Sequence, residues 1–208
     1  LLFVDQYVNW HNTLLGQAVV EVLRQQDVEV YVPSGQTPSW MTLLSSGDVV
    51  RARRLARQNI RILSDAVQSG YEIVTVEPSS ALCLKGEYPS LFGSEDAKTI
   101  AESTSDICNY LCELHDDAGL KLDFEPVDVS VLYHQPCHAR ALDPANPALK
   151  LLEMIPGVDI ELADAGCSGM AGTFGLQRKN FVTSIRIGRK LIGKMKETKA
   201  RLGATECS

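Results

Sequence analysis

The sequence contains no long hydrophobic run, no excess of positive charge and few aromatic residues. Its apolar runs extend over only a few residues, whereas a membrane-spanning helix needs about 20 apolar residues in succession. The 20 Lys and Arg are outnumbered by 26 Asp and Glu, which gives a net charge of −6. Phosphate recognition normally needs an excess of basic residues on one face. The sequence therefore argues against a membrane-spanning protein and against a nucleic-acid binder.

The sequence also has no starting Met, no signal peptide and no transit composition. It opens on the apolar run 1–4 and ends abruptly at 205–208, so we expect the chain to be part of a longer protein. Its 208 residues, of which 45% are apolar, suffice for one domain or two small ones. Six cysteines in a chain of this size, without a secretory signal, favour thiol chemistry or metal ligation over a disulfide framework.

Strand patterns and helix patterns alternate along the sequence. Short apolar runs that predict buried strands lie at residues 1–4, 28–32, 72–76, 129–133 and 158–162, with a weaker one at 204–205. Helical patterns lie between them, at residues 13–26, 48–69, 94–115, 147–154 and 173–201. This alternation predicts an α/β protein with mostly parallel sheets that are covered by helices on both faces.

The two halves of the sequence resemble each other when they are laid side by side. Three pairs of segments correspond: 1–7 with 132–138, 22–40 with 151–169, and 59–80 with 184–207. Each pair contains a loop that follows a predicted strand. We therefore predict two pseudo-repeated halves, residues 1–116 and 128–208, joined by a charged linker.

Three cysteines follow the three predicted strands of the second half: Cys137, Cys167 and Cys207. Loops after parallel strands meet at one edge of the sheet, so we expect the three thiols to converge there. Three converging thiolates are typical of an iron-sulfur cluster or a zinc ion. The alternative is that they are small buried apolar side chains, as free cysteines often are.

The residues around these cysteines suggest further contacts to a metal centre. Gly166, Gly169 and Gly172 lie in a glycine-rich loop before a predicted long helix, and such a loop can direct backbone N–H groups and the start of a helix at anionic sulfur. Glycine also permits close approach of the backbone. His134 and His138 flank Cys137 and are candidates for ligation or for hydrogen bonds to sulfur; the alternative is that they stabilise a turn. Cys108 and Cys112 lie four residues apart on a predicted helix, with His115 about one turn further on, and are predicted to be core residues of a packed helix; the alternative is that they form one side of a metal site.

These motifs resemble the CCG-type cysteine-rich domain (the domain of unknown function numbered 224) of iron-sulfur oxidoreductase subunits. That family includes the B subunit of heterodisulfide reductase, the C subunit of anaerobic glycerol-3-phosphate dehydrogenase, and glycolate and lactate oxidase iron-sulfur subunits. The most specific stretches are residues 133–138 and 166–175, and the resemblance covers essentially the whole chain. In this family each of two repeats carries a Cys after its first strand, Cys-Cys-Gly after its second and Cys-x-x-Cys after its third.

According to the resemblance, the two repeats differ in how many of the family's cysteines they retain. In the first repeat, Gln6, Pro38-Ser39-Trp40 and Ser80 stand where the family has its motifs, and only Cys83 keeps a family cysteine. This implies that the first site holds no cluster and that Cys83 is a remnant or a minor ligand. In the second repeat Cys137, Cys167 and Cys207 match, Ser168 replaces the second cysteine of the pair, and a fourth cysteine is expected at position 210. The resemblance thus implies one 4Fe-4S cluster.

The function implied by the resemblance is electron transfer within a flavin-linked dehydrogenase complex. FAD would lie on a partner dehydrogenase subunit, and electrons from glycerol 3-phosphate or a 2-hydroxy acid would pass through a ferredoxin-like iron-sulfur region toward quinone or another acceptor. A cytoplasmic location, or one at the inner face of the membrane, would follow. No acid-base pair or nucleophile is recognisable, so we expect no catalytic residues in this chain. The alternatives are a zinc-stabilised structural domain and a cluster-free subunit-interaction module.

Overall fold

The computed structural model describes residues 1–207 and divides the chain into two compact units. The first unit comprises Leu1–Lys121, and the second begins at Leu122. Each unit contains a three-stranded parallel sheet with helices around it. The prediction of an α/β protein with parallel sheets is therefore confirmed. None of the helices in residues 1–207 combines the length and the apolar character needed to cross a membrane.

The sheet of the first unit has the order β1-β2-β3, with all neighbours parallel. Its strands are β1 (Leu2–Phe3), β2 (Ile73–Thr75) and β3 (Thr104–Asp106). Its helical segments are α1 (Gln6–Trp10), α2 (Thr13–Gln25), α3 (Met41–Ser45), α4 (Val49–Gln68), α5 (Pro78–Leu82), the π-helical η1 (Cys83–Glu87), α6 (Tyr88–Phe92), α7 (Glu95–Glu102) and α8 (Ile107–Ala118).

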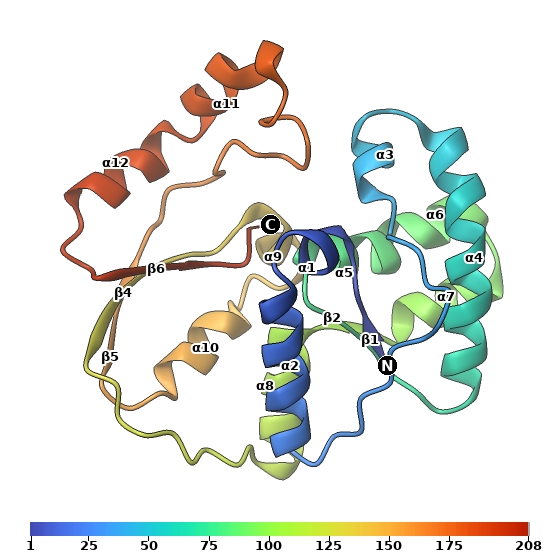
Figure 1. The fold of residues 1–208 in the computed structure, drawn as a ribbon, viewed down its shortest axis with the longest axis horizontal. Helices are drawn as coiled ribbons and strands as arrows, with labels where there is room; N and C mark the ends of the chain where they lie inside the picture. The colour runs from blue at the N-terminus through green and yellow to red at the C-terminus, as the bar shows by residue number, and fades with distance from the viewer. Residues whose placement is uncertain (208) are drawn as a thin grey trace. The chain divides into compact units, whose positions relative to one another are not determined.

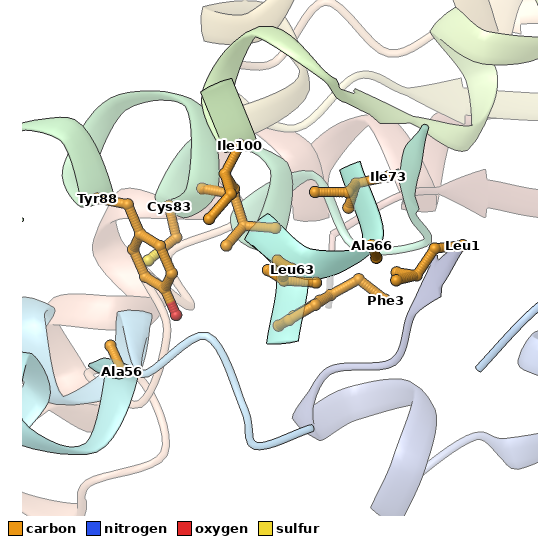
Figure 2. Packing of buried hydrophobic residues seen from close by; sticks show 10 residues of the cluster. Leu1, Phe3, Ala56, Leu63, Ala66, Ile73, Cys83, Tyr88 and Ile100 are labelled. Carbon is orange, nitrogen blue, oxygen red and sulfur yellow. The ribbon is translucent and has the colours of Figure 1, made fainter. Parts of the chain in front are cut away.

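Figure 1 traces the strands and helices of this unit, and its buried apolar side chains form two clusters, one on each face of the sheet. On one face, Phe3 and Ile73 pack against α4 through Leu63 and against α7 through Ile100, as Figure 2 shows. On the other face, Leu2 packs with residues of α2, while α8 contributes partly buried apolar side chains. Alternate strand residues therefore face opposite cores, as the pleat of a strand requires.

The second unit has the strand order β5-β4-β6, again with parallel neighbours. Its strands are β4 (Val129–His134), β5 (Val158–Leu162) and β6 (Leu202–Thr205). Its helices are α9 (Cys137–Leu142), α10 (Pro147–Glu153), the 3-10 helix η2 (Arg178–Asn180), α11 (Phe181–Ile187) and α12 (Arg189–Glu197). The central strand β4 supplies most of the buried strand residues, whereas β5 and β6 remain largely exposed.

The strand predicted at residues 28–32 does not form. This segment reaches β1 through one backbone hydrogen bond, from the Leu2 amide to the Tyr31 carbonyl (2.8 Å), and Tyr31 and Val32 are exposed. Its counterpart in the second half, β5, pairs with β4 from Val158 to Leu162. An apolar run alone therefore does not make a strand, because a strand also requires a partner along its length.

Two predicted helices are interrupted. The helix predicted at 94–115 is divided into α7 and α8 by β3, whose sequence Thr104-Ser105-Asp106 has no apolar residue. Asp106 ends this strand and caps α8, since its carboxylate accepts from the Cys108 and Asn109 amides. The helix predicted at 173–201 begins only at Phe181 and is divided into α11 and α12 at Gly188.

Candidate metal centre

The three loops that follow the strands of the second unit carry Cys137, Cys167 and Cys207. Cys137 is the first residue of α9, shortly after β4. Cys167 lies in the loop after β5, and Cys207 is the second residue after the end of β6. Because β4 lies between β5 and β6 and all three strands run parallel, their carboxyl ends share one edge of the sheet. The sheet order therefore brings the three cysteine-bearing loops to the same edge.

The sulfur atoms of these cysteines interact with one another and with the loop that carries Cys167. Partial burial, followed by the influence of Cys167 and Cys207, raises the pKa of the Cys137 thiol, and a hydrogen bond with Cys167 contributes. The Gly169 amide donates to the Cys167 Sγ at 3.3 Å. The Ser168 Oγ lies 3.1 Å from the Cys207 Sγ. All three cysteines are free thiols, so each is available as a ligand.

The donor chemistry of this edge fits an iron-sulfur cluster. Three of its side chains are free thiols, although residues 1–207 contain no group of three His, Cys, Asp or Glu side chains positioned to hold a metal ion. Thiolates are the ligands of iron-sulfur clusters, and a cluster spreads its ligands over several iron atoms rather than around one. The Gly169 backbone N–H, which donates to the Cys167 sulfur, is a further feature that favours anionic sulfur.

His134, the last residue of β4, connects the other two loops. Its side chain is buried; the Nε2 lies 2.7 Å from the Gly166 carbonyl oxygen and the Nδ1 lies 3.2 Å from the Thr205 Oγ1. A carbonyl only accepts, so Nε2 carries a proton, and in the neutral ring Nδ1 then accepts from the Thr205 hydroxyl. The Thr205 oxygen in turn accepts from the Cys207 amide at 3.2 Å. Both ring nitrogens are thus used to fix the loops of Cys167 and Cys207.

His138 lies in α9, next to Cys137, and is partly buried. This burial lowers the pKa of its imidazole below the ordinary value, which favours the neutral ring. A neutral imidazole keeps one nitrogen lone pair and one N–H, so His138 retains both roles that the sequence suggested for it, ligation and hydrogen bonding to sulfur.

The glycines of the loop after β5 serve its turns and its packing. Gly166, Gly169 and Gly172 have φ angles of +74°, +91° and +62°. A Cβ at Gly169 would overlap the Ser184 carbonyl of α11, and the Ser184 hydroxyl donates to the Gly169 carbonyl at 2.8 Å. The expected helix start at this loop is wrong, because residues 173–176 form turns and α11 begins at Phe181. The donors to sulfur are therefore loop groups rather than a helix terminus.

The equivalent edge of the first unit is held together by the Asp5 carboxylate, which the sequence did not single out. Asp5 is 6% exposed and accepts from the Gln6 amide (2.8 Å), the Ser39 amide (3.1 Å) and the Ser80 hydroxyl (2.6 Å). Gln6, Ser39 and Ser80 are the residues that the resemblance places at family cysteine positions, an assignment that stays a prediction. An acidic residue directly after a buried strand was the only sequence signal for this role. Hydrogen bonds thus join the three loops of the first unit.

Cys83 lies in the core of the first unit, with 0% of its surface exposed, beside the ring of Tyr88 (Figure 2). Its thiol donates to the Ser39 carbonyl (3.4 Å), which also accepts from the Tyr88 hydroxyl (3.3 Å). Burial raises the pKa of this thiol far above the ordinary value, with a smaller contribution from Asp5. Cys83 is therefore a neutral core thiol in this structure.

Trp40 and Gly169 share an unusual backbone conformation. Trp40 has a φ of +67° and Gly169 a φ of +91°, and a positive φ is rare for a bulky residue. The two residues occupy corresponding positions, after Pro38-Ser39 in one half and after Cys167-Ser168 in the other. The two residues therefore share a positive φ at positions that the predicted alignment of the halves pairs with each other.

Comparison with known proteins identifies similarity over most of the chain. Residues 131–208 match the family model described as "CCG: Cysteine-rich domain". The C subunit of anaerobic glycerol-3-phosphate dehydrogenase from Escherichia coli K12 is 29% identical over 202 residues, which are 97% of this chain and 50% of that protein. Lactate utilization protein A of Geobacillus thermodenitrificans is 31% identical over 186 residues, covering 85% of this chain and 74% of that protein.

A third relative is the B subunit of the fumarate reductase (CoM/CoB) from Methanothermobacter marburgensis. It is 31% identical over 174 residues, which are 82% of this chain and 32% of that protein. The chain spans about half the length of the glycerol-3-phosphate dehydrogenase subunit that it matches. The similarity therefore extends across both units, since the family model covers the second and the longer matches include the first.

Proposed function

The chain belongs to the family of CCG cysteine-rich-domain proteins, and from this premise we propose that its second unit holds one iron-sulfur cluster that carries electrons in a dehydrogenase complex. The observation that carries this proposal is the convergence of the Cys137, Cys167 and Cys207 loops at one sheet edge. When bound, such a cluster takes up and releases electrons one at a time.

The protein's own residues would perform three tasks at this site. Cys137, Cys167 and Cys207 would ligate as thiolates, together with a fourth ligand. The Gly169 amide, 3.3 Å from the Cys167 sulfur, would stabilise negative charge on that ligand. His134 would hold the loops of Cys167 and Cys207 at a fixed separation, because it bonds to Gly166 and Thr205.

The first unit would contribute structure rather than a second cluster. Its corresponding loops are joined by Asp5, and its one family cysteine, Cys83, is a buried neutral thiol. A thiol that is buried against a carbonyl must lose that hydrogen bond and its proton before it can ligate metal. We therefore expect one cluster per chain.

The complex itself is proposed from the relatives. Their names include an anaerobic glycerol-3-phosphate dehydrogenase subunit and lactate utilization proteins. By this similarity the chain would receive electrons from a flavin-containing partner subunit that oxidises glycerol 3-phosphate or a 2-hydroxy acid, through a ferredoxin-like region. It would deliver them to quinone or another acceptor.

The direct test is metal analysis of protein prepared without oxygen. We expect iron and acid-labile sulfide in equal amounts, with the broad visible absorption of an iron-sulfur protein. Cys137→Ser and Cys167→Ser should lose most of the iron, while Cys108→Ser, a change on α8 in the other unit, should retain it.

Two results would favour the alternatives. A colourless protein with one zinc ion per chain would indicate a zinc-stabilised domain that uses the same cysteines. A metal-free protein whose partner binding is unchanged in Cys137→Ser and Cys167→Ser would indicate a subunit-interaction module.

A further inference from the structure

The Ser168 hydroxyl lies beside a cysteine that is proposed to ligate the cluster. Its hydroxyl oxygen lies 3.1 Å from the Cys207 sulfur, and it is adjacent in sequence to Cys167. In the family pattern this position is the second cysteine of a pair, but serine supplies a hydroxyl in its place. A hydroxyl can both accept a hydrogen bond and donate one, whereas a ligating thiolate can only accept.

The direction of the hydrogen bonds around Ser168 follows from its neighbours. The Met170 amide donates to the Ser168 oxygen at 3.4 Å, which occupies one of the oxygen's lone pairs. A Cys207 that ligates metal has lost its proton. The Ser168 hydroxyl proton is then the only proton available for the 3.1 Å contact, so Ser168 donates to the Cys207 sulfur.

Close packing against α11 and α12 fixes the backbone of Ser168. Gly188, which separates these two helices, lies so close to the Ser168 carbonyl that a Cβ there would overlap its oxygen. On the next residue, the Gly169 carbonyl accepts from the buried Ser184 hydroxyl at 2.8 Å. The backbone of Ser168 is thus held against the junction of α11 and α12, which limits the movement of its hydroxyl near the Cys207 sulfur.

We propose that Ser168 raises the reduction potential of the cluster by donating a hydrogen bond from its hydroxyl to the Cys207 thiolate. This inference rests on the proposed function, since it requires a cluster at Cys207. Uptake of one electron adds one negative charge to the iron, sulfide and thiolate group. A donor to a ligand sulfur stabilises the more negative state more strongly, so reduction becomes easier. Ser168 is a positioning residue in this scheme and not a ligand.

The test compares Ser168→Ala, Ser168→Thr and Ser130→Ala in anaerobically prepared protein. Potentials are measured by titration with dithionite, followed by electron paramagnetic resonance of the reduced state. For Ser168→Ala we expect an unchanged iron content and a lower midpoint potential. A roughly tenfold less favourable reduction corresponds to about 59 mV for a one-electron couple. Ser168→Thr keeps the hydroxyl and should stay near the unsubstituted protein.

Ser130→Ala is the matched control, because Ser130 also carries a hydroxyl in the second unit but lies near the start of β4. A second readout is the exchangeable proton near the cluster. Its hyperfine coupling, compared in H2O and D2O, should disappear in Ser168→Ala alone.

Each outcome has a distinct meaning. A cluster with an unchanged potential in Ser168→Ala overturns the inference and leaves the proposed function intact. Loss of iron in Ser168→Ala with retention in Ser130→Ala also overturns it, because Ser168 would then be a ligand. If the unsubstituted protein holds no iron-sulfur cluster, the proposed function fails, and the inference fails with it.

Discussion

At the scale of single residues, Asp5 shows how a carboxylate joins three loops. It is buried and receives hydrogen bonds from Gln6, Ser39 and Ser80, so each loop depends on the same group. Removing an acceptor leaves buried donors without a partner, which is more costly than losing a hydrogen bond at the surface. Stability of the first unit should therefore be unusually sensitive to this residue.

Asp5→Ala should lower the free energy of unfolding by about 3 kcal/mol. The change leaves buried donors without an acceptor, and each unsatisfied donor costs about 1–3 kcal/mol of stability. Asp5→Asn keeps the shape and one acceptor oxygen, so its effect should be smaller. Unfolding in urea, followed by circular dichroism, measures both. As a control, Asp48→Ala removes an exposed carboxylate that caps α4 and should cost about 1 kcal/mol. Equal losses for Asp5→Ala and Asp48→Ala would contradict the proposed role of Asp5.

Cys83 and Cys137 should differ sharply in reactivity. Burial raises the pKa of both thiols, but Cys83 is fully buried and its pKa is raised strongly, whereas the Cys137 side chain is accessible to reagent. Because the thiolate is the reactive form, iodoacetamide should modify Cys137 in the folded, metal-free protein and leave Cys83 unmodified. Peptide mass spectrometry after timed labelling measures the two rates, and labelling in urea provides the control in which both react. Rapid labelling of Cys83 in the folded protein would contradict this expectation, since it would show that the core of the first unit unfolds locally often enough to expose the thiol.

At the scale of elements, the junction between α11 and α12 packs against the loop that carries Cys167 and Ser168. Gly188 lies against the Ser168 carbonyl, and Ser184 bonds to the Gly169 carbonyl. Gly188 and Gly169 are both needed because another atom occupies the space that a Cβ would take. The helices after the loop therefore determine where Cys167 and Ser168 lie.

Gly188→Ala should displace the loop and reduce iron binding severalfold, because the added methyl overlaps the Ser168 carbonyl. Gly193→Ala is the matched control, since Gly193 lies in α12 with no atom within 4 Å of its added Cβ. That control should retain its iron and gain up to about 1 kcal/mol of helix stability. Iron content after reconstitution, measured for both variants, distinguishes them. Equal iron contents would mean that the loop tolerates displacement.

At the scale of the whole molecule, the two units join their strand-end loops in different ways. The first unit uses Asp5 and core packing, while the second relies on His134, Ser184 and the proposed metal centre. A ligand that binds only the folded state stabilises that state by mass action. Metal should therefore stabilise one unit and not the other.

Removing the metal should increase amide hydrogen exchange at the second unit's loops, residues 135–138, 164–172 and 205–207. Exchange around Asp5 and Ser39 in the first unit should stay unchanged, because no metal ligand is proposed there. Hydrogen exchange with mass spectrometry, on metal-loaded and metal-free protein, tests this for both units in one sample. An increase in both units would show that the first unit also depends on metal.

Much of this organisation was predictable from local patterns. The apolar runs at 72–76 and 129–133 predicted β2 and β4, because buried parallel strands are nearly continuous in their hydrophobicity. The segment 158–162 predicted β5, although this strand alternates apolar and acidic residues and is largely exposed rather than buried. The position of three cysteines after three strands was also readable, although their role as ligands stays a prediction. β3 was missed, because Thr104-Ser105-Asp106 is polar and its strand depends on pairing with β2.

The sequence by itself determined the α/β class, the parallel strands with strong apolar runs and the cysteines on strand-end loops. Only the tertiary structure decided that β4 lies between β5 and β6, that Asp5 joins one set of loops and that His134 joins the other. The physical reason is range. Hydrophobic periodicity reports burial within one segment, whereas these hydrogen bonds join residues far apart in the chain, whose proximity exists only once the sheet has formed.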